Sequence, residues 1–269
     1  MRGRSTAEFR FYAELNDFLP ATRKFRPFPV AFDGRPAVKD PIEALGVPHT
    51  EVDLVLVNGR SVPFSHRLGD GDRVAVYPCF EALAIEPAQR LRARPLRRPA
   101  FVLDVHLGRL ARLLRLCGFD ALYRNDLADD EIVAISLSER RIILTRDRGL
   151  LFRRAITHGC WVRATAPLLQ LREIVERLDL AARIRPFARC AECNGIIRSV
   201  PKARVADRLP PRVREAHRTF RQCGGCGRVY WKGSHHERLS ARLAALRNDA
   251  AGLGRGAPAA RTGADGHGR

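Results

Sequence analysis

The sequence has little lysine and methionine, and it lacks any long apolar run. Only four of its 48 basic residues are lysine, and it contains a single methionine. No apolar stretch approaches the roughly 20 residues that a membrane-spanning helix needs. The first residues are polar and lead into a strand pattern, unlike a secretory signal. We therefore expect no membrane segment and a cytoplasmic location.

Cysteine is also sparse, with seven residues in 269. The number is odd, and four of the seven form two C-x-x-C pairs separated by 29 residues. In a protein that is not secreted, this pattern indicates a metal site and not disulfides. Four thiolates close a tetrahedral structural zinc site that has no open position for a substrate. The predicted zinc ligands are Cys190, Cys193, Cys223 and Cys226.

Negative charge becomes scarce toward the carboxy-terminal end. Residues 1–86 hold 11 Lys and Arg against 12 Asp and Glu, residues 87–180 hold 18 against 11, and residues 181–269 hold 19 against 6. A basic surface attracts polyanions through phosphate contacts and counterion release. General use of arginine on a solvated surface is the alternative, but it would have enriched the first 86 residues as well. The gradient favours nucleic acid as a partner.

The first segment, residues 1–85, shows the order strand, strand, helix, strand, strand of a β-grasp domain. Asp40-Pro41-Ile42-Glu43 has the residues that start a helix, and Asn58-Gly59 is a two-residue hairpin signal. The predicted strands are 8–15, 29–32, 53–57 and 73–77, and the predicted helix ends at Gly46.

Residues 86–99 are rich in proline and arginine and are expected to be a linker. Residues 100–185 alternate strands (100–105, 119–123, 141–145, 160–164) with helices (107–117, 129–140, 149–157, 167–182), which predicts a parallel sheet with helices on both faces. A zinc ribbon with a basic insert is expected over 186–240. Residues 241–269 should form a helical end and a disordered tail.

Acidic residues follow the predicted parallel strands at one edge of the sheet. Asp104 ends the first strand, Asp147 follows the third, and Asp129 and Asp130 open the helix after the second. Carboxylates that converge without a cation repel one another, so this arrangement predicts a bound Mg²⁺ or Mn²⁺, held by Asp104 and Asp147 in particular. Such an ion activates water for phosphodiester hydrolysis.

Each acid also has a simpler interpretation. Asp129 or Asp130 could cap a helix, and Asp147 could belong to a loop turn. Asp104 is harder to explain in this way, because a charge inside the apolar run 101–105 is costly without a partner or a metal.

The amino-terminal part resembles the ubiquitin-like sulfur carriers in Val57-Asn58-Gly59 and Asp70-Gly71-Asp72. Carriers end in a free Gly-Gly tail, whereas here Pro78-Cys79-Phe80-Glu81 follows and the chain continues. We therefore expect a binding or scaffolding module that could take a protein partner, and not a carrier.

The runs Phe101–Arg115, Cys117–Asp120, Asp129–Ile132 and above all Ile142–Arg148 resemble the mut-seven carboxy-terminal RNase family. The resemblance implies a ubiquitin-like domain, a PIN-like nuclease domain and a zinc ribbon. It also implies that Asp104, Asp147 and one or both of Asp129 and Asp130 bind metal. Arg146 and Arg148 would face phosphate. The sequence departs from PIN nucleases after the fourth strand, where Thr165 and Ala166 stand in place of a fourth acid.

Aromatic and basic residues in and after the insert suit stacking on unpaired bases and contact with phosphate. The candidates are Lys202, Arg204, Trp231 and Lys232, although Trp231 could equally pack against the zinc turns. The leading hypothesis is a metal-dependent ribonuclease whose ribbon holds RNA across the acidic edge. The alternatives are a non-catalytic RNA-binding protein and a ubiquitin-like or sulfur-transfer adaptor. The sequence leaves the oligomeric state open.

Overall fold

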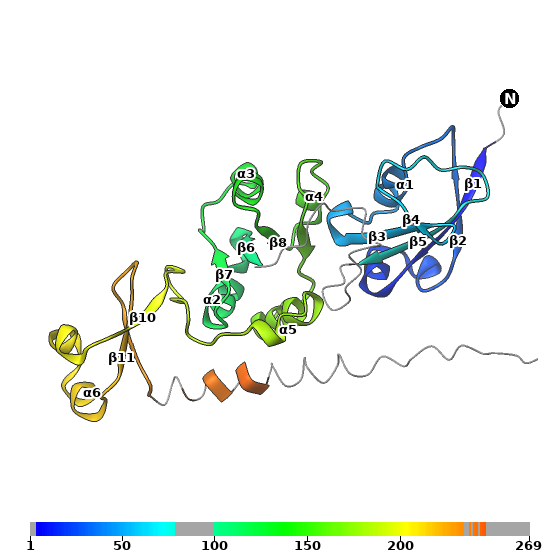
Figure 1. Cartoon of the computed structure of the whole chain (residues 1–269). Helices are drawn as coiled ribbons and strands as arrows, with labels where there is room; N and C mark the ends of the chain where they lie inside the picture. The colour runs from blue at the N-terminus through cyan, green and yellow to red at the C-terminus, as the bar shows by residue number, and fades with distance from the viewer. Residues whose placement is uncertain (1–3, 79–98, 234–236, 238, 242, 246–269) are drawn as a thin grey trace, which may run out of the picture.

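A computed structural model of the chain describes residues 4–78, 99–233, 237, 239–241 and 243–245. Three sheets follow one another along the chain (Figure 1): a mixed sheet in blue and cyan, a parallel sheet in green, and a small antiparallel sheet in yellow and orange. Short 3-10 helices lie in the connections between helices and strands, at Ala13–Phe18, Ala21–Arg23, His49–Glu51, Val105–Leu107, Ala181–Arg183, Lys202–Arg204 and Ala206–Arg208.

The amino-terminal sheet has the order β2-β1-β5-β3-β4. Its first and last long strands, β1 and β5, are parallel, and the other pairs are antiparallel. This is the predicted β-grasp arrangement, with the helix α1 covering the core through the buried side chain of Ile42. The elements are β1 (Ser5–Phe11), β2 (Phe28–Phe32), α1 (Lys39–Ala44), β3 (Val52–Val57), β4 (Arg60–Ser61) and β5 (Arg73–Pro78).

The second sheet is parallel throughout and has the order β7-β6-β8-β9. Successive residues of a strand face opposite sides of a sheet, so Phe101 and Leu103 pack with α2 and α5 while Val102 packs against α3 and α4. The elements are β6 (Ala100–Leu103), α2 (Gly108–Leu116), β7 (Asp120–Leu122), α3 (Asp129–Glu139), β8 (Ile142–Thr145), α4 (Arg148–Leu151), β9 (Gly159–Trp161) and α5 (Pro167–Arg177).

Two of these helices are shorter than the sequence pattern predicts. The chain turns after α4 through a hydrogen bond from the Ile156 N–H to the Arg153 carbonyl, which brings Ile156 into the core ahead of β9. The helix α5 is followed by Asp179, whose φ of 45° is incompatible with a continuing helix.

The third sheet, which we call the ribbon, is antiparallel with the order β10-β11-β12. The basic insert folds back onto one of its faces, where Val205 and Leu209 pack against Phe220. The elements are β10 (Ile197–Val200), α6 (Pro211–Ala216), β11 (Phe220–Cys223) and β12 (Val229–Trp231).

Several expectations fall on residues outside this description. The predicted linker lies there except for Pro99, as does the tail from residue 246. Residues 243–245 are helical, and Leu243 is buried in the core beside α2 and α5. No helix in the described part of the chain is long and apolar enough to span a bilayer.

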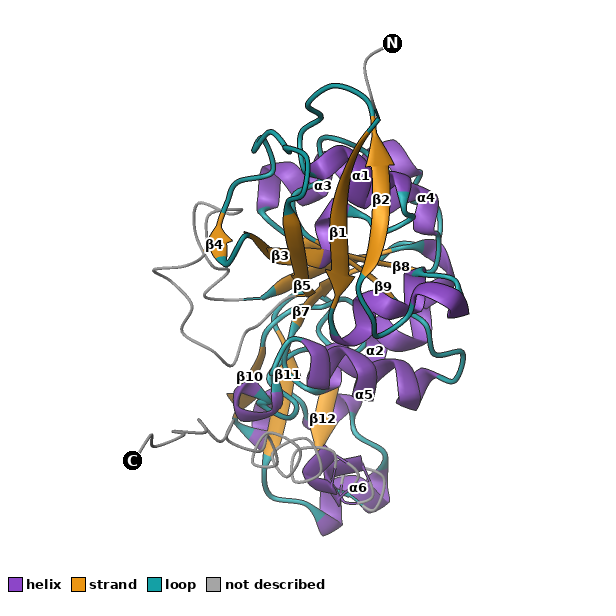
Figure 2. Cartoon of the chain, turned by 90° about the vertical axis from the view of Figure 1, so that its right-hand side faces the viewer, coloured by secondary structure: helices purple, strands orange, loops and turns teal. Residues whose placement is uncertain are grey.

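The amino-terminal sheet is docked on the parallel sheet along β9, its edge strand. In Figure 2, where the first domain faces the viewer, β8 and β9 lie behind it. The Glu51 carboxylate accepts the backbone N–H of Trp161 and pairs with Arg177, and the Glu51 side chain is fully buried. The first domain thereby covers a strand edge that would otherwise expose unpaired backbone groups.

A second part of this interface is built on aromatic rings. Phe18 and Trp161 pack with their ring centroids 5.2 Å apart. The guanidinium groups of Arg148 and Arg163 lie over both rings, at 5.0 to 5.6 Å from the ring centroids. Arg163 also forms an ion pair with Asp17 at 2.9 Å. The first domain is therefore held by charge, by hydrogen bonds and by cation–π contacts.

The buried pair between Glu51 and Arg177 leads to a stability prediction. Burial by itself lowers the pKa of Arg177, but the carboxylates of Glu51 and Glu14 outweigh it and raise the pKa above its ordinary value. Arg177→Met leaves the Glu51 carboxylate buried without a cation, which should lower the free energy of unfolding by about 3–5 kcal/mol. Urea unfolding followed by the fluorescence of Trp161 measures this change.

The matched control lies on the same helix. Arg172 pairs with Glu176 at the surface, one helical turn apart. Arg172→Met should cost no more than about 0.5 kcal/mol, because exposed ion pairs contribute little. Equal losses in the two variants would show that the interface does not depend on the buried pair.

Candidate active site and metal centre

Asp104 and Asp147 are joined through a buried threonine at the carboxyl end of the parallel sheet. The Thr145 hydroxyl donates to the Asp104 carboxylate at 2.8 Å and accepts the backbone N–H of Asp147 at 2.8 Å. Asp104 also accepts the backbone N–H of His106 at 3.0 Å. Thr145 is fully buried at the end of β8, so it sets the position of both acids.

The turn interpretation of Asp147 is also correct, since its carboxylate accepts the Gly149 N–H at the start of α4. Asp104 is only 7% exposed. Within the described residues, neither Asp104 nor Asp147 forms an ion pair. Asp104 is thus linked to Thr145 through its carboxylate and Asp147 through its backbone N–H. The Asp147 carboxylate interacts with the Arg153 guanidinium only at longer range.

Asp129 and Asp130 lie in the first turn of α3, at the same edge of the sheet. They do not cap this helix, because the capping position is Ala128, whose N–H is accepted by Glu131. Both acids pair with Arg153 instead, Asp129 at 3.8 Å and Asp130 more closely. Their carboxylates and that of Asp147 raise the pKa of Arg153, with Asp130 contributing most.

The acids share this edge without converging on one point. In the part of the chain that the structure describes, the four cysteines are the only set of three or more metal-ligating side chains whose ligand atoms lie within 4.8 Å of one another. Carboxylates at this edge repel one another, and the Arg153 guanidinium lies beside those of α3.

The two arginines beside Asp147 have different surroundings. Arg146 is exposed, and its guanidinium donates to the Ala164 carbonyl at 3.2 Å. Arg148 was expected to face phosphate, but it lies in the interface with the first domain, where it donates to the Gly46 carbonyl. Its guanidinium therefore serves domain docking, because Phe18 and Trp161 surround it.

The position after β9, where the sequence offers no acid, is reached by a glutamate of α5. The Glu173 carboxylate accepts the backbone N–H groups of Arg163 and Ala164 and pairs with the Arg163 guanidinium at 3.2 Å. Since an arginine and two backbone donors occupy this carboxylate, Glu173 is a structural residue at this edge.

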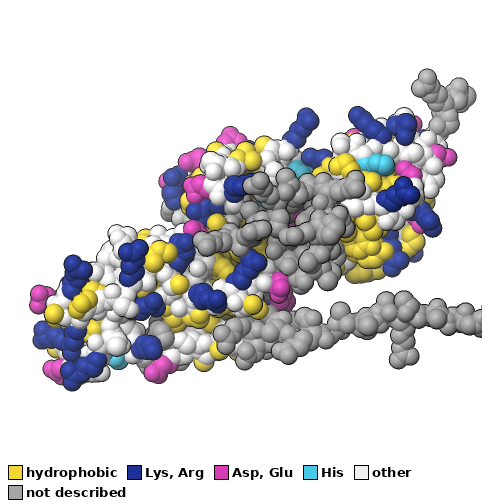
Figure 3. Space-filling view, viewed as in Figure 1, with side chains coloured by type: hydrophobic (Ala, Val, Ile, Leu, Met, Phe, Trp, Pro, Cys, Tyr) yellow, Lys and Arg dark blue, Asp and Glu magenta, His cyan; other side chains and the backbone are white. Residues whose placement is uncertain are grey.

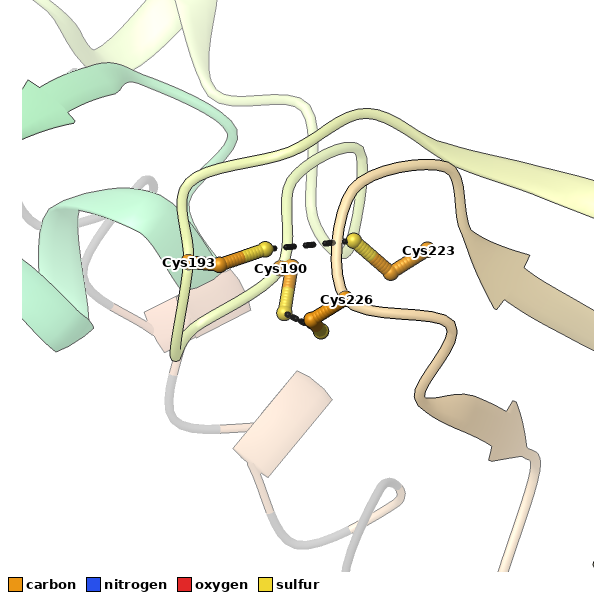
Figure 4. Close-up of side chains that lie close together, drawn as sticks. All are labelled: Cys190, Cys193, Cys223 and Cys226. Carbon is orange, nitrogen blue, oxygen red and sulfur yellow. Dashed lines mark hydrogen bonds between the residues drawn. The ribbon is translucent and has the colours of Figure 1, made fainter.

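The cysteine centre is compact (Figure 4). The sulfur of Cys190 lies 3.6 Å from that of Cys226, and the sulfur of Cys193 lies 3.3 Å from that of Cys223. Four thiolates around one zinc ion at a Zn–S distance of about 2.3 Å would lie about 3.8 Å apart. The four cysteines therefore fit a tetrahedral ion and could bind zinc.

The surroundings of the four thiols differ: the pKa of Cys190 and of Cys193 is lowered, whereas the Arg228 N–H lowers the pKa of Cys226 but burial and the neighbouring thiols outweigh it and raise it to about 12. Burial raises the pKa of Cys193, but the Gly195 N–H and the Cys223 thiol outweigh it and lower the pKa to about 6. By contrast, burial among apolar groups raises the pKa of Cys117 to about 12. Thiolate is the form that binds metal, so the first knuckle, Cys190 and Cys193, differs chemically from the buried single cysteine.

The ribbon lies at the amino-terminal ends of the parallel strands, opposite the carboxyl ends that carry the acids. Asp120, the first residue of β7, binds Arg189 at 2.9 Å and Asn194 at 2.8 Å. Arg115, near the end of α2, donates to the carbonyls of Ala191 and Glu192. Polar contacts therefore fasten the ribbon where the strands begin, away from the acids, and the expectation that it holds RNA across the acidic edge stays a prediction.

Only some of the ribbon residues predicted to contact RNA have side chains without another contact in the described part of the chain. Lys202 donates to the Arg214 carbonyl within the insert, and Arg204 is exposed. Trp231 packs on the insert beside Phe220 and not against the zinc turns, where Tyr230 packs instead. Lys232 follows β12 and lines a groove together with Trp231.

Models of two protein families match this chain. One, described as the Mut7-C RNAse domain, matches residues 99–243, and the other, described as Mut7-C ubiquitin, matches residues 4–84. The chain belongs to the Mut7-C RNase family. No curated protein and no solved structure matches it. Membership of the Mut7-C RNase family confirms the predicted architecture and indicates a nuclease.

Sequence reasoning missed two residues of the Mut7-C RNase acidic edge. Thr145 precedes Asp147 at the end of a buried strand, and a buried threonine requires a hydrogen-bond partner. That position was the available signal. Arg153 gave no such signal, since only the fold brings it to the start of α3.

Proposed function

We propose that this chain is a Mg²⁺- or Mn²⁺-dependent ribonuclease that cleaves RNA at the edge carrying Asp104 and Asp147, and that its four cysteines hold a structural zinc ion. The observation that carries the proposal is the Asp104–Thr145–Asp147 arrangement, in which a buried hydroxyl positions two acids that form no ion pair among the described residues. Carboxylate oxygens are the ligands that Mg²⁺ and Mn²⁺ prefer.

The chain's own residues would divide the work. Asp104 and Asp147 would hold the ion, with Asp129 or Asp130 as a further ligand from α3. When bound, the ion lowers the pKa of a coordinated water and stabilises charge on the phosphate. Arg146, exposed beside Asp147, would contact phosphate. Arg153 would give up part of its pairing with Asp129 and Asp130 when the ion enters.

The test distinguishes the structural zinc ion from the Mg²⁺ or Mn²⁺ needed for cleavage. The full chain is dialysed into metal-free buffer until it retains only tightly bound zinc, and one zinc per chain is confirmed by atomic spectrometry. Cleavage of a labelled RNA should then be absent and should return with Mg²⁺ or Mn²⁺. The same sequence as DNA shows whether RNA is preferred.

Asp147→Asn, purified in parallel, is the control for contaminating nucleases. It should retain its zinc and lose cleavage. Cleavage that persists in Asp147→Asn, or without added metal, would exclude this mechanism. RNA binding without any product in the intact chain would favour the non-catalytic alternative.

A further inference from the structure

A groove lies at the ribbon, away from the acids. It has a volume of about 1000 Å³ and runs between the ribbon and the last turn of α2, with Leu116 and Phe187 on one side and Tyr230 on the other. Its walls are mostly apolar. On the ribbon it is lined by Ser199, Arg221 and Tyr230, which are paired across the strands and so share one face of the sheet. Lys202 of the insert and Trp231, which packs on the insert, also line it.

The rim of this groove is strongly basic. Arg218, Arg221 and Lys232 line it and, as far as the structure describes the chain, form no ion pair. Arg112 and Arg228 also line it and share the single acid, Glu192, at 2.6 and 3.2 Å. The rim therefore carries unneutralised positive charge, and in Figure 3 Lys and Arg side chains crowd the ribbon end with hydrophobic side chains between them.

The aromatic ring in this groove is held in place by the metal centre. The Tyr230 hydroxyl contacts the Cys190 sulfur at 2.9 Å, and the ring is half-buried on β12, directly across the strand pair from Arg221. A fixed ring beside an arginine matches an unpaired base and its phosphate, since bases stack on aromatic rings and phosphates pair with cations. A duplex keeps its bases stacked inside and cannot reach an apolar floor in this way.

We propose that this groove binds single-stranded RNA, with a base against Tyr230 and the backbone along Arg218, Arg221 and Lys232. The inference rests on the proposed function in that it names the substrate: unpaired RNA long enough to reach both the groove and the acidic edge. The helix α2 has nine residues, about 13 Å, and separates the two places. Short oligonucleotides would occupy only one of them.

The test measures binding without catalysis. Fluorescence anisotropy with a labelled 20-nucleotide oligouridylate is recorded on the full chain in metal-free buffer, with zinc content and melting temperature checked for each variant. Tyr230→Leu should raise the dissociation constant by roughly 5- to 150-fold, the range for losing one stacked base. Tyr230→Phe keeps the ring and should stay within about twofold of the parent.

Charge variants provide a second, independent measurement. Arg221→Ala should weaken binding and reduce the slope of log affinity against log salt by about 0.7, the value for one phosphate contact on a single strand. Arg198→Ala is the matched control, because Arg198 is also an exposed arginine of the ribbon sheet but does not line the groove. It should leave the slope unchanged.

The outcomes are distinct. If Tyr230→Leu loses zinc, the comparison of RNA binding by Arg221→Ala and Arg198→Ala tests the proposal. Binding that is insensitive to Arg221→Ala, or duplex RNA that binds as well as the single strand, overturns the proposal and leaves the groove to a protein segment. If the chain cleaves RNA but Arg221→Ala does not change binding, only the groove proposal is excluded. If Arg221→Ala weakens binding but the chain cleaves no RNA, only the nuclease proposal is excluded.

Discussion

Asp104→Asn is expected to lower the cleavage rate by about 100- to 1000-fold while the fold is retained. An amide lacks the charge that holds a divalent ion, and such an ion contributes several kcal/mol to the transition state, with each 1.4 kcal/mol worth a factor of ten. The Asn oxygen can still accept one of the two hydrogen bonds that Asp104 accepts from Thr145 and His106. Single-turnover cleavage and thermal melting measure the two effects.

Two further variants sharpen this prediction. Thr145→Val keeps the volume of the buried side chain but removes the hydroxyl that joins Asp104 to the Asp147 backbone. It should weaken Mn²⁺ binding, measured by calorimetry, together with cleavage. Asp33→Asn removes an exposed carboxylate of the first domain and should change neither. An Asp104→Asn enzyme with parental activity would place the chemistry elsewhere.

Loss of the metal from the cysteine centre should unfold the ribbon and leave the parallel sheet folded. The core around the knuckles is small: its buried members are Cys190, Ile197 and Cys223. Zinc binding contributes about 10–16 kcal/mol to the folding of comparable small domains, more than such a core can supply. Cys223→Ser should therefore lose its zinc and the folded state of the ribbon.

Amide hydrogen exchange measures the unfolding of the ribbon and of the parallel sheet separately. In Cys223→Ser, amides of β10, β11 and β12 should exchange within seconds, while those of β6 and β8 stay protected. Cys117→Ala is the matched control, since Cys117 is fully buried beside α2 and lies outside the centre. It should keep one zinc per chain. Protected ribbon amides in a zinc-free protein would contradict the prediction.

Local chemistry explains why much of the fold could be predicted. The Asn58-Gly59 pair occupies the positive φ values of 50° and 79° that a tight hairpin requires. Apolar runs identified β6 and β8, because burial on both faces leaves this pattern. Alternation indicated β1 but misplaced it over 8–15, whereas the strand is Ser5–Phe11 and Ala13–Phe18 form a 3-10 helix. Helix ends were less predictable, since the interruption of α4 depends on where Ile156 must enter the core.

The candidate sites divide in the same way. The cysteine centre was predictable because two short knuckles carry their own geometry in their spacing. The order of strands and acids was predictable because the carboxyl ends of parallel strands share one edge. Thr145 and Arg153, which contact those acids, were not predicted. A hydrogen-bond partner from another turn or loop leaves no pattern in the spacing of residues along the sequence.

The sequence by itself determined the element order, the acidic edge and the four-thiol centre, since each follows from residues close together or from strand direction. Only the tertiary structure decided that the ribbon lies at the edge opposite the acids, held by Asp120 and Arg115. It also decided that Arg148 lies over the packed rings of Phe18 and Trp161, in the interface with the first domain. Both depend on contacts between residues far apart in the chain, which form only when separate sheets pack together.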